Sequence, residues 1–292
     1  MIDHYPDDIE RIVAGTARIA VHELAGVPSS PPLLISHATG FHAHAYLELA
    51  NRLASRYHVF GMDHRGHGAS RAPDGDTIDW ADCGADTAAV GRSIAPAGGL
   101  VGVGHSMGGA TLLLAARRDP ELFERLILFE PIAFPPGDQA DTATNSPLVV
   151  GALRRRRRFD SYNQAFDHYA AKRPLNQFDP AVLRNYVDYG FAPVKLPDGT
   201  DAGIELRCTP EMESATFAAS VNTGLWSQLP DIDVPVVVIG SGDGDGPSLI
   251  APLVAERLGN AKFVSFPEQN HFGPFIRPDL LAGEVLRGRV EP

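Results

Sequence analysis

The sequence predicts an α/β fold, a mostly parallel, doubly wound sheet with an inserted helical lid. Short, nearly continuous apolar runs recur along the chain, as in strands that are buried on both faces. Helical patterns separate these runs, which is typical of parallel α/β domains. The alternation stops between residues 133 and 229, where helical stretches follow one another. We therefore expect a core of residues 1–132 and 230–292 and a mainly helical lid of residues 133–229.

The expected strands are apolar runs that end in turn or polar residues. An alternating stretch at residues 16–23 predicts an antiparallel edge strand at the start of the core. The buried strands are expected at residues 33–36, 58–62, 100–103, 126–129, 236–239 and 262–265.

The expected helices carry apolar residues at helical spacing. Asp119-Pro120 ends one of them, because proline cannot continue a helix. Pro135-Pro136-Gly137-Asp138 predicts a linker into the lid, and Pro197-Asp198-Gly199 predicts a turn within it. Core helices are expected at residues 46–55, 107–118 and 252–258, and lid helices at residues 154–171, 180–189 and 210–219.

Composition narrows the class of partner. The 292 residues carry a formal net charge of −11, which disfavours binding to nucleic acid or to anionic lipid. The two cysteines, Cys83 and Cys208, match no metal or redox spacing. The acidic first ten residues contain no apolar stretch, and no apolar run reaches the length of a membrane span. We expect a cytoplasmic protein without a membrane span.

The strongest chemical signal is Gly104-His105-Ser106-Met107-Gly108-Gly109, which follows an apolar strand and opens a helix. This G-x-S-x-G context predicts a sharp turn that exposes the serine hydroxyl near the positive end of the helix. Side chains at Gly104 or Gly108 would collide with the turn. We predict that Ser106 is a nucleophile.

A serine hydroxyl needs a base, and the base needs an orienting acid. His271 follows the last expected strand and is the predicted base. Asp243 follows the penultimate strand, with room for a helix and a strand before His271, and is the predicted acid. Two alternatives stay open, namely Asp245 two residues later and Glu130 at the end of an earlier strand.

An oxyanion formed at the substrate requires backbone N–H donors. The residue after the nucleophile, Met107, supplies one donor. The loop after an early strand, His37-Ala38-Thr39-Gly40-Phe41-His42, supplies the other, and its spacing points to Thr39.

Together these motifs resemble the α/β-hydrolase superfamily, near its esterase-like members with a helical lid. The resemblance covers roughly residues 17–132 and 232–280, and the lid is only loosely similar. It is carried by residues 37–41, 63–70 (Asp-His-Arg-Gly-His-Gly-Ala-Ser), 104–109, 240–243 and 271–274.

The resemblance implies hydrolysis of a carboxylic ester or related acyl bond, without a cofactor or metal. Some relatives place their acid at the position of Glu130. Two departures matter. The oxyanion loop has His37-Ala38 where relatives usually have His-Gly, and the Gly-rich loop of carbon–carbon hydrolases is absent. A carbon–carbon hydrolase or lyase, or a non-catalytic ligand-binding member, remains an alternative.

The remaining features concern substrate and lid. Residues 63–70 are expected to form a structural turn rather than a metal site. The run from Arg154 to Arg158 is either a solvated or internally paired face or a gate for anionic substrates. Aromatic residues of the lid are candidates for a mainly apolar acyl pocket around a small-molecule ester-like substrate. They are Phe134, Phe159, Tyr162, Phe166 and Tyr169.

Overall fold

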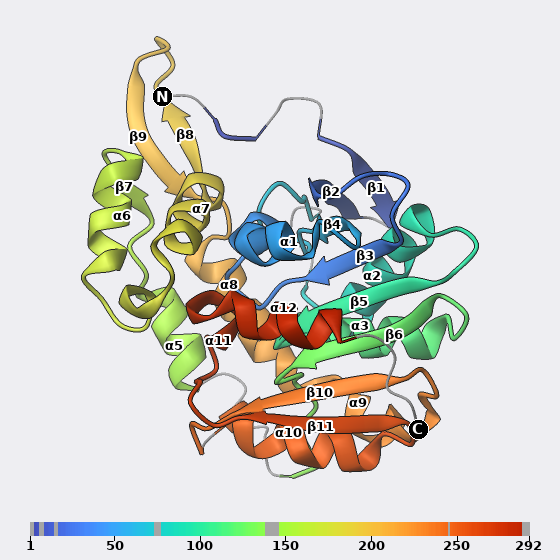
Figure 1. The fold of residues 1–292 in the computed structure, drawn as a ribbon. Helices are drawn as coiled ribbons and strands as arrows, with labels where there is room; N and C mark the ends of the chain where they lie inside the picture. Colours follow the sequence, from blue (N-terminus) through green and yellow to red (C-terminus); the bar gives the residue numbers. More distant parts are fainter. Residues whose placement is uncertain are drawn as a thin grey trace.

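The computed structural model describes residues 3–5, 9–14, 17–72, 77–137, 146–244 and 246–287. Its main sheet has the strand order β1-β2-β4-β3-β5-β6-β10-β11. The pairs β1–β2 and β2–β4 are antiparallel and the other pairs are parallel, which confirms the expected class (Figure 1). The strands are β1 (Arg11–Ala14), β2 (Ala17–Ala25), β3 (Pro32–Ser36), β4 (His58–Met62), β5 (Leu100–His105), β6 (Phe123–Phe129), β10 (Val236–Ser241) and β11 (Ala261–Phe266).

Alternate residues of the central strands enter two separate apolar clusters, one on each face of the sheet. In β3, Leu34 joins the cluster beneath one layer of helices, whereas Leu33 and Ile35 join the opposite cluster. This explains why the buried strands are almost continuously apolar in sequence. The first layer contains α2 (Trp80–Ile94), α3 (Met107–Arg118) and α10 (Gly246–Arg257), and the second contains α1 (Leu47–Leu53) and α12 (Pro278–Leu286).

Several elements differ from the expectation. The edge strand is β1, and β2 pairs on both sides. Helix α10 begins before Pro252 and contains it. Helix α2 is not among the helices predicted from the sequence. Asp79 is its N-cap residue, and the Asp79 side chain accepts a hydrogen bond from the Ala81 N–H. The short helical turns are η1 (Ala43–Tyr46), η2 (Leu175–Gln177), η3 (Ser220–Asn222), η4 (Leu229–Asp231) and α11 (Gly273–Ile276).

Residues 146–228 form a separate group of elements between β6 and β10, which we call the insertion. Its strands build a three-stranded antiparallel sheet in the order β7-β9-β8. Its elements are α5 (Pro147–Leu153), β7 (Arg158–Phe159), α6 (Tyr162–Ala170), α7 (Pro180–Gly190), β8 (Phe191–Lys195), β9 (Asp201–Leu206), α8 (Pro210–Ala219) and α9 (Leu225–Gln228). In Figure 1 the parallel strands of the core point toward α5, α6, α7 and the small sheet, so most of the insertion lies beside their carboxyl ends. Helix α9 is the exception and packs against α3 of the core.

The single helix expected over residues 154–171 is wrong, because β7 interrupts it. Arg158 and Phe159 pair with Glu205 and Ile204 of β9. Only then does Ser161 cap α6, by accepting a hydrogen bond from the Gln164 N–H. The arginine run therefore lies between two helices rather than within one.

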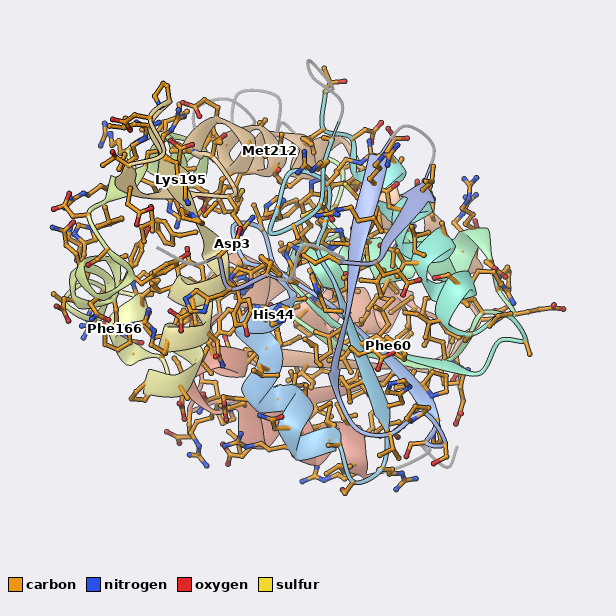
Figure 2. The ribbon with its side chains drawn as sticks, turned by 90° about the horizontal axis from the view of Figure 1, so that it is seen from above. Asp3, His44, Phe60, Phe166, Lys195 and Met212 are labelled. Atoms are coloured by element: carbon orange, nitrogen blue, oxygen red, sulfur yellow. The ribbon has the colours of Figure 1, made fainter. Side chains whose placement is uncertain are left out.

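Figure 2 separates the two regions when the molecule is seen from above. Phe166 and Lys195 of the insertion lie at one side of the molecule, and Phe60 of β4 lies at the other. Within the ranges given above, no helix is both long and apolar enough to cross a membrane.

Candidate active site

Ser106 lies at the abrupt turn from β5 into α3. Its backbone has φ 57 and ψ −117, a left-handed conformation that non-glycine residues rarely adopt. The turn leaves no room for side chains at the two neighbouring glycines. A Cβ added to Gly104 would lie 2.6 Å from the Gly109 Cα, and a Cβ added to Gly108 would lie 2.0 Å from the Ser36 carbonyl oxygen. The two glycines thus allow the strained turn that the sequence motif predicts.

His105 connects this turn to the segment of the predicted base. The His271 carbonyl can only accept, so His105 Nε2 donates to it, over 2.8 Å. The other ring nitrogen, Nδ1, must then accept from the Tyr46 hydroxyl at 2.9 Å, and that hydroxyl accepts from the Ala38 N–H at 3.1 Å. Burial, and next the nearby His271, holds the pKa of His105 well below its usual value. This series of hydrogen bonds fixes the loop of residues 37–41, the turn at Ser106 and His271 relative to one another.

The acid that contacts the His271 ring is Glu130. His271 Nδ1 and Glu130 Oε2 are 2.5 Å apart, and the Glu130 side chain is fully buried. Its other oxygen accepts from the Ser241 N–H at 2.7 Å. Burial alone would raise the pKa of Glu130, but hydrogen bonds from His271 and Ser241, with the charge of His271, lower it. A carboxylate placed in this way stays ionised and accepts from Nδ1, which leaves the proton of a neutral imidazole on Nδ1 and the lone pair on Nε2.

The structure does not bring Asp243, the acid predicted from the sequence, to the ring of His271. Its carboxylate accepts from the backbone N–H of His271, over 2.9 Å, and the ring nitrogen is occupied by Glu130. Asp243 is exposed, whereas Glu130 is buried. Asp245, the other alternative, lies outside the described residues. Of the acids considered from sequence, the structure therefore brings Glu130 to the ring.

The oxyanion loop, residues 37–41, is held by two buried histidines. His37 Nδ1 donates to the Ala38 carbonyl oxygen at 2.8 Å, and its Nε2 accepts from the His64 N–H at 2.8 Å. His67 Nε2 accepts from the Gly40 N–H at 3.1 Å. Burial lowers the pKa of both rings, so both remain neutral and able to accept.

The two predicted oxyanion donors lie next to each other. The Thr39 hydroxyl is 3.3 Å from Met107 Sδ, and both residues are buried. Met107 is the first residue of α3, so its N–H has no acceptor within the helix. This arrangement is compatible with two backbone donors that face the space beside Ser106.

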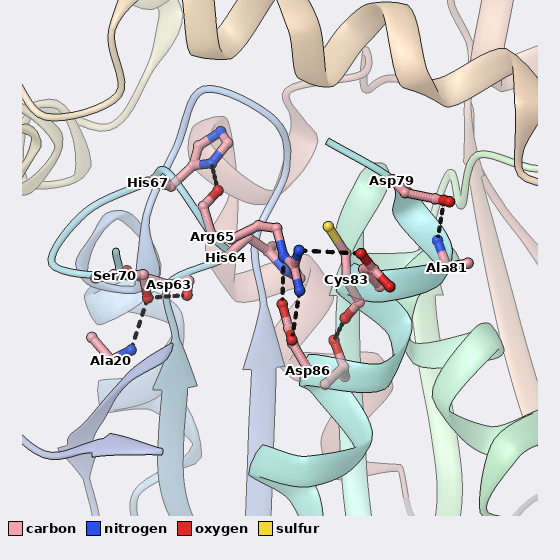
Figure 3. A network of polar contacts seen from close by, with 12 residues as sticks. Ala20, Asp63, His64, Arg65, His67, Ser70, Asp79, Ala81, Cys83 and Asp86 are labelled. Carbon is pink, nitrogen blue, oxygen red and sulfur yellow. Dashed lines mark hydrogen bonds and ion pairs between the residues drawn. The ribbon is translucent and has the colours of Figure 1, made fainter. Parts of the chain in front are cut away.

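The turn at residues 63–70 is held by polar contacts to the surrounding core, some of which Figure 3 shows. Asp63 accepts hydrogen bonds from the N–H groups of Ala43 and Ala69, both at 2.8 Å. Arg65 forms a two-pronged ion pair with Asp86 of α2. Among the described residues no group of His, Cys, Asp and Glu could hold a metal ion.

The aromatic residues near the site are not those expected from the insertion. Phe159 and Tyr169 are buried within the insertion itself, Phe166 packs under Arg184, and Phe134 packs on the α2–α3 side of the sheet. A different cluster adjoins His271 through Phe272, with ring centroids 5.7 Å apart. Sequence reasoning missed this cluster, although two members flank predicted site residues. Its rings belong to Phe41, Phe178, Tyr186, Phe272 and Phe275.

The arginine run is paired within the insertion. Arg157 and Arg158 form exposed ion pairs with Glu211 and Glu205, respectively. Arg155 instead pairs with Glu213, and both side chains are largely buried, at 17% and 10% exposure. The run is therefore not a uniform surface of free charge.

Comparison with known proteins shows the family of this chain. A family model described as "Alpha/beta hydrolase family" matches residues 33–284, so the chain belongs to this family. The 2-(acetamidomethylene)succinate hydrolase of Mesorhizobium japonicum is 25% identical over 288 residues, 95% of this chain and 93% of that protein. A monoglyceride lipase homolog of Monkeypox virus is 35% identical over 169 residues, 55% of this chain and 59% of that protein.

Solved structures share the fold. E-2-(acetamidomethylene)succinate hydrolase superposes with a TM-score of 0.78 at 21% identity, over 95% of this chain and 97% of that one. The thioesterase domain from the curacin biosynthetic pathway gives a TM-score of 0.75 at 19% identity, over 96% and 98% of the two chains. The expected α/β-hydrolase fold is thereby confirmed.

Proposed function

We propose that this α/β hydrolase is a serine hydrolase that cleaves a carboxylic ester or related acyl bond through an acyl-enzyme on Ser106. The single observation that carries the proposal is the buried Glu130 carboxylate on the ring of His271. This ring lies 5.0 Å, centroid to centroid, from that of His105, the neighbour of Ser106 at its strained turn. A neutral imidazole in this setting can take a proton from the serine, and the carboxylate stabilises the imidazolium that forms.

In the proposed reaction, Ser106 Oγ bonds to the substrate carbonyl carbon while its proton passes to His271 Nε2. The carbonyl oxygen becomes an oxyanion at the N–H groups of Thr39 and Met107. The bond to the leaving group breaks, and His271 returns its proton to that group. Water repeats the sequence on the acyl-enzyme and releases the acid. No cofactor takes part.

The half-buried Phe41 and Phe272 support a partly apolar binding space next to His271. The insertion would act as the lid over it, since it lies at the carboxyl ends of the strands that carry the site. A small-molecule ester with an apolar acyl part is the substrate class that fits this setting.

A second candidate is cleavage of a carbon–nitrogen acyl bond, or of a carbon–carbon bond, by the same residues. It is favoured by the relative named for 2-(acetamidomethylene)succinate, an N-acyl compound, which aligns over 95% of this chain. A panel that pairs p-nitrophenyl esters with N-acyl enamine acids distinguishes the two candidates.

The nucleophile is tested by Ser106→Ala. In a serine hydrolase, loss of this residue lowers kcat by about 10⁶. We expect a folded protein with almost no turnover and no labelling by a fluorophosphonate, whereas the wild-type protein is labelled at Ser106. Activity of the wild-type protein should survive EDTA. Wild-type turnover by Ser106→Ala, or loss of activity with the chelator, would overturn the proposal.

A further inference from the structure

Helix α8 of the insertion rests directly on the oxyanion loop. An added Cβ at Gly40, whose φ is 79, would lie 2.5 Å from Glu213 Oε1, so that the carboxylate and the loop backbone are in contact. The same helix is fixed to the core at Trp80, whose Nε1 donates to the Thr216 carbonyl oxygen at 3.0 Å. A negative group therefore adjoins the residue that follows Thr39.

Helix α7 of the insertion touches the other end of the same loop. The Tyr186 ring lies 5.2 Å from the Phe41 ring, centroid to centroid. The Tyr186 carbonyl oxygen accepts from His42 Nε2 at 3.1 Å. Two elements of the insertion thus enclose residues 40–42 of the core.

A single guanidinium joins these two elements. Arg155 donates to the Glu213 carboxylate of α8 and to the Tyr186 hydroxyl of α7, and it also donates to the Tyr169 hydroxyl of α6 at 3.2 Å. We call Arg155 with these three partners the Arg155 clamp. Its donors reach three helices from two different nitrogens, Nη1 toward Glu213 and Nη2 toward the two tyrosines, whereas an ammonium would have to reach all three from one nitrogen.

We propose that the Arg155 clamp positions the oxyanion loop and neutralises the Glu213 carboxylate beside it, so that the insertion helps to set the Thr39 donor. This inference rests on the proposed function of Ser106 and Thr39. A carboxylate left unpaired next to Gly40 would oppose negative charge on the substrate oxygen, because buried charges are weakly screened. Arg155 and Glu213 are positioning residues and need not touch substrate.

The test compares Arg155→Met with a matched control, Arg157→Met. Both arginines come from the same run and pair with acids of α8, but the Arg157–Glu211 side chains are 43% and 65% exposed. Arg155→Met should lower kcat for p-nitrophenyl acetate by about 10- to 100-fold, less than the loss of a whole oxyanion donor. Arg157→Met should stay within about twofold of the wild-type value.

The charge component is tested by adding Glu213→Gln to Arg155→Met. The double variant should be more active than Arg155→Met, because it removes the unpaired carboxylate. The inhibition constant of a trifluoromethyl ketone, which places an oxyanion on Ser106, should rise by the same factor as kcat/KM falls. A structural role without influence on the oxyanion would raise KM instead, and it would give no recovery in the double variant.

Stability is followed in parallel, and Tyr186→Phe serves if Arg155→Met does not fold. Removing this hydroxyl should lower kcat by about 3- to 10-fold, the size of one typical hydrogen bond, because Arg155 keeps its other partners. If kcat and the labelling of Ser106 were unchanged in Tyr186→Phe and in any folded Arg155→Met, the proposed role of the Arg155 clamp would be wrong. The proposed serine hydrolase function would still stand. Failure of the wild-type protein to label at Ser106 would overturn the proposed function as well.

Discussion

The neighbouring strands β6 and β10 each end beside an acid that contacts His271, yet the two acids contact different atoms. Glu130, directly after β6, is buried and meets the ring at Nδ1. Asp243, two residues after β10, is exposed and accepts from the backbone N–H. Only a contact to the ring can control the tautomer of the imidazole. The burial of each carboxylate and the His271 atom that it contacts therefore distinguish the two acids better than their order along the chain does.

The local backbone explains the difference. Glu130 has φ 46, and its N–H donates to the Ile239 carbonyl oxygen of β10 at 2.9 Å. This hydrogen bond fixes the backbone of Glu130 against β10, and from there its side chain reaches the ring of His271. Asp243 follows Gly242, whose position allows close approach to the Pro267 carbonyl oxygen, 2.1 Å from an added Cβ. That turn carries Asp243 outward, toward the His271 backbone.

The largest effect expected from this comparison is that of Glu130→Gln. Loss of the orienting carboxylate should lower kcat by about 10³- to 10⁴-fold, since the amide favours the wrong tautomer and cannot stabilise the imidazolium. Steady-state kinetics on the best ester of the panel, with circular dichroism to verify folding, measures it. A loss below about tenfold would show that another acid serves the ring.

A smaller effect is expected from Asp243→Asn. The amide oxygen can still accept from the His271 N–H, so kcat should fall by less than about tenfold. Asp243→Ala removes the acceptor, but water can replace it at this exposed position. If Asp243→Asn lowered kcat more than Glu130→Gln does, Asp243 would be the acid that orients His271, as predicted from the sequence. The contact between Glu130 and the ring would then not be the one used in catalysis.

The sequence alone predicted the parts of the site that depend on local backbone. The glycines around Ser106 and the strand before it predict the turn, because only that combination relieves the steric conflict at Gly104 and Gly108. The apolar runs predict the buried parallel strands for a similar reason, since both faces of the sheet are covered.

Features that depend on contacts distant in sequence could not be predicted. Glu130 and His271 are 141 residues apart, and nothing near either one specifies which acid reaches the ring. The insertion shows the same limit. Five consecutive arginines look alike in sequence, yet Arg155 alone among the pairs described is drawn into a largely buried contact, by Glu213 and two tyrosines. Strand β7 likewise forms only because β9 lies beside it.

The smallest expected effect concerns stability and pH, and it tests the environment of Glu130 independently of turnover. The pKa of Glu130 lies below its usual value in the folded protein. Its ionised form therefore stabilises the fold above the usual glutamate pKa, and this contribution is lost as the pH falls through the lower, folded value. The difference in Tm between the wild-type protein and Glu130→Gln should become smaller as the pH is lowered from 6 to 3. The reason is that the glutamine variant has no carboxyl group to protonate at this position. Thermal unfolding of both proteins across that range measures the difference. A gap that widens toward acid pH would mean that burial outweighs the hydrogen bonds from His271 and Ser241, and that the carboxyl is protonated too readily to orient the ring.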